Sequence, residues 1–148
     1  MKIVIQRVRY AAVKIDDKVY GTIDKGFVLL IGFTHSDNKE TCEKLANKVS
    51  GLRIFEDEAG KLNKCLADID GSILSISQFT LYADCKKGRR PGFELAMKPD
   101  QATILYDHFN DCLRNLDQKV VTGVFQADMK IELVNDGPVT IILDSAEL

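Results

Sequence analysis

The chain has 148 residues, of which 45% are hydrophobic and 28% are charged. These values are typical of one soluble globular domain with a real hydrophobic core, so we assign residues 1–148 to a single domain. The formal net charge of −2 argues against a broad nucleic-acid-binding surface, because contacts to phosphate dominate the affinity of such surfaces.

The first part of the chain predicts strands. Residues 2–8 predict one strand, and residues 11–15 and 18–23 predict a hairpin around Asp16-Asp17, where aspartates favour a tight turn. Gly26 to Gly32 encloses a short apolar run whose length and β-branching are typical of a buried strand.

Two helices are predicted further along. Asp37 is a suitable N-cap for a helix that runs to about Ser50, and Gly51 is a natural stop. The second helix begins near Pro99, because proline is favoured in a first turn. Their apolar faces are Cys42, Leu45, Ala46 and Val49 in the first, and Ala102, Leu105, Phe109, Cys112 or Leu113, and Leu116 in the second.

The remaining elements are strands, predicted at residues 52–55, 72–81, 119–125, 128–134 and 139–143, with a turn at residues 57–60. Most connections are hairpin-like. The pattern therefore predicts an α+β fold with a largely antiparallel sheet and two main helices.

No membrane or targeting segment is predicted. No apolar run approaches the roughly 20 residues of a membrane span, and Met1 to Val4 enters a strand directly, unlike a signal peptide. The cysteines are spread widely and form no CxxC pair, so neither a zinc site nor a redox motif is indicated. We expect a cytoplasmic protein with reduced thiols.

The sequence lacks the common catalytic motifs. No P-loop, HExxH pattern or Rossmann glycine series is present, so no nucleotide cofactor or catalytic metal is expected. We expect His35 and His108 to lie at the surface or to contact site residues without touching the substrate. A Ser-His-Asp triad assembled in space stays open, because such triads do not follow sequence order.

Two segments contain more than a strand requires. Ser77-Gln78-Phe79-Thr80-Leu81 can be an ordinary strand end with Phe79 and Leu81 in the core. In Asn135-Asp136-Gly137-Pro138-Val139-Thr140, the Gly-Pro step interrupts a strand. Proline cannot donate to a strand ladder, so it marks an edge, a strand start or a bulge. Specially shaped backbone of this kind often carries function.

Together these two segments resemble the defining motifs of the D-aminoacyl-tRNA deacylases, also called D-tyrosyl-tRNA deacylases. The resemblance implies that the sheet closes into a barrel-like core. The resemblance runs nearly end to end, and the other segments that carry it are Gln6-Arg7-Val8, Leu52 to Asp57, Gly88-Arg89-Arg90-Pro91, Thr122 to Phe125, and Met129. The departures are Ala12, Gly92 and Gln126, of which only Gln126 lies near the expected pocket.

The resemblance implies a role for each residue of the first motif. The N–H groups of Phe79 and Thr80 would bind the carbonyl oxygen of an ester under attack, where preorganised donors stabilise the developing charge. Gln78 and Ser77 would shape the pocket and hold the terminal adenosine. The Thr80 hydroxyl could be a nucleophile, but no adjacent base is evident. We prefer activation of water by a free hydroxyl of the terminal ribose.

For Gly137-Pro138 the resemblance implies a cis step that is inserted from one subunit into the pocket of its partner, and hence a homodimer. Sequence alone does not establish the isomer, because about 5–6% of X-Pro bonds in folded proteins are cis. The step's carbonyls would take up the α-amino group and occupy the space of an L side chain. D-aminoacyl esters would be cleaved, as would glycine, including glycine mischarged on tRNA(Ala).

Other residues have both an ordinary and a functional interpretation. Arg7 can be an exposed strand charge, whereas the resemblance places it beside the Gly-Pro step as a donor to its carbonyls. Phe125 and Met129 can be simple core residues, or they can enclose the terminal adenine. Ala96 and Pro99 resemble a pocket edge.

A short run of basic residues is a candidate phosphate site. Lys86, Lys87, Arg89 and Arg90 fall within five positions. The residues alone favour a solvated loop, whereas the resemblance favours a patch that grips the 3′ acceptor end of an aminoacyl-tRNA.

The resemblance thus implies a member of the D-aminoacyl-tRNA deacylase family, for which no cofactor is expected. One alternative is a non-catalytic nucleic-acid-binding protein, which would not need both motifs. Another is a deacylase of the same fold that clears L-amino acids or misattached glycine and alanine, and this depends on how the Gly-Pro carbonyls point.

Overall fold

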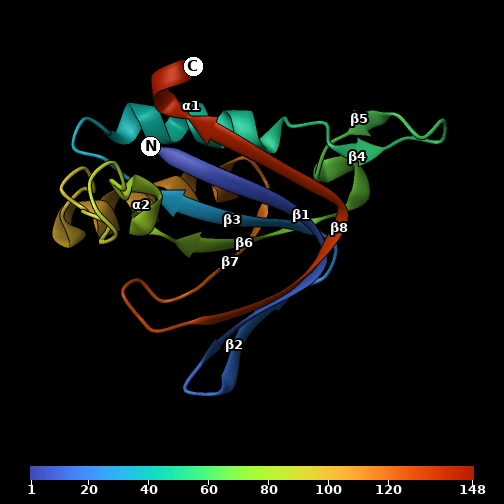
Figure 1. Ribbon diagram of the computed structural model, residues 1–148. Coiled ribbons are helices and arrows are strands. Elements are labelled where there is room, and N and C mark those ends of the chain that lie inside the picture. Colours follow the sequence, from blue (N-terminus) through green and yellow to red (C-terminus); the bar gives the residue numbers. More distant parts are fainter.

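The computed structural model describes residues 1–148, and a strongly curved sheet forms its centre (Figure 1). The long first strand, β1 (Lys2–Ile15), organises the sheet, because it pairs antiparallel with β2 (Lys18–Ile23), β3 (Gly26–Gly32) and β8 (Lys130–Asp144). Beyond β3 the sheet continues in parallel through β6 (Ser72–Ser77) and β7 (Lys119–Thr122).

The sheet curls until its ends approach each other. A Cβ atom added to Gly21 of β2 would lie 2.6 Å from Cγ1 of Val121 in β7, so these two strands meet across the barrel-like interior. The predicted α+β class with two main helices is confirmed. The sheet is mixed, since two of its five strand pairings are parallel.

Both faces of the central strand β3 are buried, which explains its nearly continuous hydrophobic run. Odd-numbered residues of β3, such as Phe27 and Leu29, lie in a large core that the two helices cover. Val28, between them, joins a smaller core inside the curl with Val8 and Leu74. Figure 1 shows the helices together on one side of the sheet and β2 at the far end.

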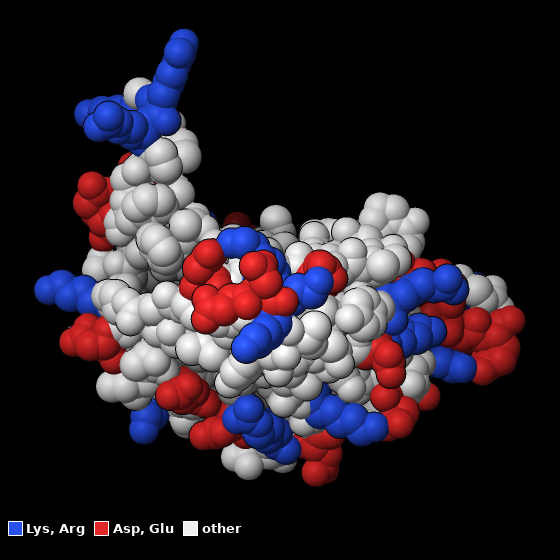
Figure 2. All heavy atoms as spheres, turned by 90° about the horizontal axis from the view of Figure 1, so that it is seen from below, with Lys and Arg blue, Asp and Glu red and all other residues white.

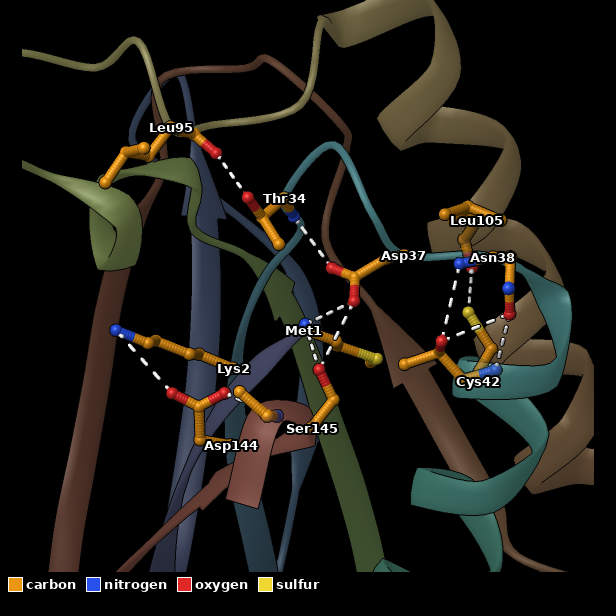
Figure 3. A network of polar contacts seen from close by, with 12 residues as sticks. Met1, Lys2, Thr34, Asp37, Asn38, Cys42, Leu95, Leu105, Asp144 and Ser145 are labelled. Carbon is orange, nitrogen blue, oxygen red and sulfur yellow. Dashed lines mark hydrogen bonds and ion pairs between the residues drawn. The ribbon is translucent and has the colours of Figure 1, made fainter. Parts of the chain in front are cut away.

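The first helix, α1 (Lys39–Ser50), corrects one prediction. Its N-cap is Asn38, whose side chain accepts from Thr41 N–H at 2.9 Å, and not Asp37. The Asp37 carboxylate is instead buried against the Met1 amino group, and it accepts from Thr34 N–H at 2.7 Å (Figure 3). The amino group also donates to Ser145 Oγ at 2.6 Å. One buried ion pair thus ties together the starts of β1 and α1 and the end of β8.

The second helix, α2 (Pro99–Asn115), begins at Pro99 as predicted and buries its expected apolar face. The predicted hairpin is also confirmed, and Asp16 and Asp17 both have positive φ angles. No helix is both long and apolar enough to cross a membrane. All four cysteines are free thiols.

Several predicted boundaries are wrong. The strand predicted at 52–55 is only β4 (Phe55–Glu56), paired with β5 (Leu62–Lys64). The strand predicted at 72–81 ends at Ser77, and a 3₁₀ turn, η2 (Phe79–Tyr82), follows it. Segments 2–8 and 11–15 form the single strand β1, and 128–134 and 139–143 form β8. Two more 3₁₀ turns are η1 (Ala67–Ile69) and η3 (Ser145–Glu147).

Candidate active site

The main cavity, of about 700 Å³, opens where β6 ends. Three segments far apart in sequence form most of its wall, and Ile31 and Phe33 at the end of β3 also contribute. Ser77, Gln78 and Phe79 come from the end of β6, Ala96 and Pro99 come from the approach to α2, and Phe125 and Met129 come from the loop between β7 and β8. Twelve of its 18 lining residues are hydrophobic, so the cavity suits a flat apolar group with a few polar contacts.

Gly32 on the neighbouring strand β3 determines where the segment Ser77–Phe79 lies. Gln78 N–H donates to Ile31 O at 2.6 Å, which holds the end of β6 beside β3. A Cβ atom added to Gly32 would lie 2.9 Å from Gln78 O and 3.1 Å from Leu81 Cβ. Gly32 therefore lets η2 pack directly on β3, and the chain turns at Gln78 instead of continuing as a strand.

This turn leaves two backbone donors without a carbonyl partner. The hydrogen bonds of η2 begin with Leu81 N–H, which donates to Gln78 O at 3.3 Å. The N–H groups of Phe79 and Thr80 precede that bond, and first-turn N–H groups have no partner within their own turn. Phe79 is 57% exposed, so the alternative interpretation, an ordinary strand end with Phe79 in the core, does not hold.

The Thr80 hydroxyl lies beside an amide and not beside a base. Gln78 Nε2 donates to Thr80 Oγ1 at 2.5 Å. An amide group cannot take up the hydroxyl proton, and no histidine or carboxylate contacts this oxygen. His35 contacts Glu94 O at 2.7 Å and His108 contacts Glu43 Oε1 at 3.2 Å, and neither histidine lines the cavity.

The opposite wall is supported from the helix side. The ring of Tyr106 lies 5.9 Å from that of Phe125, and its hydroxyl donates to Ser75 O at 2.8 Å. Burial raises the pKa of Tyr106, which keeps the phenol neutral and donating. A Cβ atom added to Gly123 would lie 2.5 Å from Met129 Sδ, so glycine there makes room for the methionine side chain at the cavity.

The Gly137–Pro138 step forms a bulge of β8. Gln6 of β1 pairs with Thr140, and Val8 pairs with Asn135, so residues 136–139 stand opposite Arg7 alone. The Gly137–Pro138 peptide bond is cis, and Gly137 has a φ of 126°, which L residues rarely adopt. Both residues of the step are exposed.

Arg7 anchors this bulge from beneath. Only 5% of its surface is exposed, so it is not an exposed strand charge. Its Nε donates to Asp136 O at 2.9 Å and one terminal nitrogen donates to Ile54 O at 2.7 Å. The guanidinium lies 6.0 Å from the centre of the Phe55 ring. Arginine can satisfy two carbonyls at fixed angles because its donors form a rigid fork.

The structure therefore separates the predicted residues into two groups. Ser77, Gln78, Phe79, Ala96, Phe125 and Met129 line the cavity, and Thr80 lies at its edge through Gln78. Arg7, Gly137 and Pro138 do not line it. A single chain thus contains a pocket and a separate, exposed Gly-Pro step.

Some lining residues were not predicted. Phe93 packs edge-on against Phe79 with ring centres 5.0 Å apart. Gln126, Lys98 and Asp128 also lie at the wall, and Lys130 Nζ holds Asp128 Oδ2 at 2.8 Å. Only Gln126 had a sequence signal, as a departure from the family pattern, and its φ of 65° is left-handed. No group of three or more His, Cys, Asp or Glu side chains could hold a metal ion.

Comparisons with known proteins agree with this fold. The family model described as D-Tyr-tRNA(Tyr) deacylase matches residues 4–144. A D-aminoacyl-tRNA deacylase of Thermus aquaticus is 54% identical over 147 residues, covering 99% of this chain and 97% of the relative. One of Thermomicrobium roseum is 55% identical over 148 residues, covering 100% and 96%.

A solved structure supports the fold independently. The chain described as c-Myc DNA Unwinding Element Binding Protein superimposes with a TM-score of 0.92 at 39% identity, over 97% of this chain and 98% of that one. The single α+β domain with its pocket at the end of β6 and these full-length matches together define the class of protein to which the chain belongs. The chain belongs to the D-Tyr-tRNA(Tyr) deacylase family.

Proposed function

We propose that this protein hydrolyses the ester bond of D-aminoacyl-tRNA and releases the free D-amino acid and tRNA. The observation that carries the proposal is the cavity that unites Ser77, Gln78 and Phe79 with Phe125 and Met129. Family membership and the names of relatives that are more than half identical along the whole chain support it.

The cavity suits the 3′-terminal adenosine of an aminoacyl-tRNA. Phe125 and Met129 offer an apolar wall on which an adenine can lie, because every base has a flat π face. Gln78 and Ser77 offer polar groups at the other wall. The reacting carbonyl would then lie near the free N–H groups of Phe79 and Thr80, which would stabilise the negative charge that develops on its oxygen.

The geometry favours an attacking water over a nucleophilic threonine. A hydroxyl nucleophile needs a base that takes up its proton. Thr80 Oγ1 accepts a hydrogen bond from the Gln78 amide, which has no such capacity. The free hydroxyl of the terminal ribose lies next to the ester in any aminoacyl-tRNA, and we assign it the role of assisting water.

Selection between D and L esters is assigned to the Gly137–Pro138 step of a second subunit. Within one chain the step is exposed and does not line the cavity, so it can reach a cavity only in another copy. Its carbonyls would bind the α-amino group and fill the space of an L side chain. Glycyl esters, including glycine mischarged on tRNA(Ala), would pass this filter because they have no side chain.

The outer edge of β8 supports a homodimer. β8 pairs only with β1, so its second edge is open along 15 residues. Val134 and Ile142 on this strand are 52% and 67% exposed. Long open edges with apolar side chains are normally covered in folded proteins.

The test is hydrolysis of matched D- and L-tyrosyl-tRNA, with a variant in which Gly137-Pro138 is replaced by Ala-Ala. We expect rapid loss of the D ester alone, and weaker or less selective hydrolysis by the variant. Stability of both esters in the presence of folded protein would contradict the proposal.

A second function has one observation in its favour. The structural neighbour at 39% identity is named as a DNA-unwinding-element-binding protein, and this chain has an exposed basic run at residues 86–90. A purely DNA-binding role would leave the cavity unused, so substitutions in the cavity would then not affect function.

A further inference from the structure

The segment Asp84–Gly92, which we call the basic arm, projects from the wall of the cavity. An antiparallel bridge closes its base, where Asp84 N–H donates to Gly92 O at 2.8 Å and Gly92 N–H donates to Asp84 O at 2.9 Å. Figure 2 shows its Lys and Arg side chains as a blue tip at upper left, with no acidic atoms at the tip.

The positive charges of the arm are unpaired. Lys86, Lys87, Arg89 and Arg90 are all exposed, and none takes part in an ion pair with this chain. The arm's only carboxylate, Asp84, accepts from Lys86 N–H at 2.9 Å at the base. Four cations within five positions on a chain of net charge −2 form a local anion-attracting surface.

Both ends of the arm join the rim of the cavity. Just before the arm lies η2, which contains Phe79, and directly after it comes Phe93. These two rings pack against each other and both line the cavity. A nucleic-acid strand whose 3′ end enters the cavity would pass this aromatic pair first and then reach the arm.

The composition of the arm indicates which part of the RNA it meets. Single-stranded sites combine basic groups with aromatic rings on which bases stack. Residues 85–91 contain no aromatic residue, whereas the rim has two, Phe79 and Phe93. Double-stranded RNA is bound mainly through its phosphates and shape. The aromatic rim therefore suits the unpaired 3′ nucleotides, and the arm suits the helix beyond them.

We infer that the basic arm binds backbone phosphates of the acceptor-stem duplex of the tRNA whose 3′ end occupies the cavity. This inference rests on the proposed function and extends it from the terminal adenosine to the stem. The arm then raises affinity for whole tRNA without taking part in ester hydrolysis.

The kinetic test compares Arg89→Ser/Arg90→Ser with the matched control Lys48→Ser/Lys61→Ser, which removes the same charge at exposed positions of α1 and the β4–β5 turn. Each enzyme is assayed with D-tyrosyl-tRNA and with a D-tyrosyl-CCA trinucleotide, which has no stem. We expect the arm variant to lose about tenfold in kcat/KM on tRNA and to match the control on the trinucleotide.

Salt dependence gives a second readout. Each lost phosphate contact lowers the slope of log affinity against log salt by roughly 0.7 to 0.9. The arm variant should therefore show a slope shallower by about 1.4 to 1.8, measured as KM for tRNA between low and moderate salt. An unchanged slope, or an equal loss on tRNA and trinucleotide, would overturn the inference.

A binding assay keeps the inference separate from the proposed function. If wild-type protein hydrolyses neither substrate, the proposed function fails, but fluorescence anisotropy with uncharged tRNA still tests the arm. Alkylation of the exposed Cys85 thiol on the arm should slow at least several-fold when tRNA is bound. Equal binding and equal protection by a DNA duplex of the same length would identify a general polyanion site and contradict a tRNA-stem site.

Discussion

The cavity at Ser77–Phe79 and the Gly137–Pro138 step differ in how much of their surroundings a single chain provides. The cavity is complete within one chain, since β6, the approach to α2 and the β7–β8 loop all contribute to its wall. The step is held from below by Arg7 but is exposed above. Under the proposed function, hydrolysis and chiral selection would therefore belong to separable parts of the molecule, and variants should affect one without the other.

The largest expected effect lies outside both regions and provides a reference. Asp37→Asn leaves the buried Met1 amino group without its counter-charge, and loss of one partner of a buried pair costs about 3–5 kcal/mol. Urea denaturation measures this loss of unfolding free energy. The control is Glu40→Gln, at an exposed position of α1. Selectivity of the folded fraction should be unchanged. A selectivity change without a stability change would contradict the placement of Asp37 outside both regions.

The next effect isolates one backbone donor of the cavity. Phe79→Pro removes the N–H of Phe79, which is the first residue of η2, and a first-turn position tolerates proline because its N–H has no partner within the turn. Phe79→Ala removes the ring alone. We expect kcat of the proline variant to fall about 10²- to 10³-fold below that of the alanine variant. Single-turnover hydrolysis measures it, and equal rates would exclude this N–H from charge stabilisation.

Arg7→Ala tests the step instead of the cavity. A hydrogen bond from a charged group contributes about 1.5–3 kcal/mol, so losing the contact to Asp136 O should lower the ratio of D to L hydrolysis by roughly 10- to 100-fold. Arg7→Lys, which keeps the charge but not the fork, should lie between. Unchanged selectivity in a folded Arg7→Ala variant would separate Arg7 from chiral selection.

The smallest effect is expected for Thr80→Ala. The change removes the acceptor of the Gln78 amide and one hydroxyl but keeps the backbone N–H. The loss of one neutral hydrogen bond predicts a fall in kcat of about two- to tenfold. Abolished hydrolysis with normal tRNA binding would instead establish Thr80 as a nucleophile.

Local patterns predicted the elements that local chemistry decides. The turn at Asp16-Asp17, the start of α2 at Pro99 and the apolar helix faces all follow from the residues concerned. Asp37 was misassigned because an aspartate side chain can serve either as an N-cap or as a counter-ion. The Met1 amino group that binds it is 36 positions away in the sequence. The end of β6 at Ser77 was missed because it depends on Gly32, which lies on another strand.

The candidate site could be predicted from the sequence only in part. The two motifs were identified, but their separation into a cavity and an exposed bulge depends on how β1 pairs with β8. Phe93 carried no signal of its own, since its place opposite Phe79 results from closure of the basic arm. Gln126 was noticed as a departure from the family pattern. Its left-handed backbone and its position at the cavity wall could be seen only in the folded structure.

The most direct test of the central claim mixes two variants. Phe79→Pro has a disabled cavity and an intact step, and Gly137-Pro138→Ala-Ala has an intact cavity and a disabled step. With the first in excess, most active cavities face an intact step of the partner subunit, and the account predicts recovery of D-selective hydrolysis. A mixture that stays as unselective as the Ala-Ala variant alone would contradict the assignment of pocket and step to different subunits.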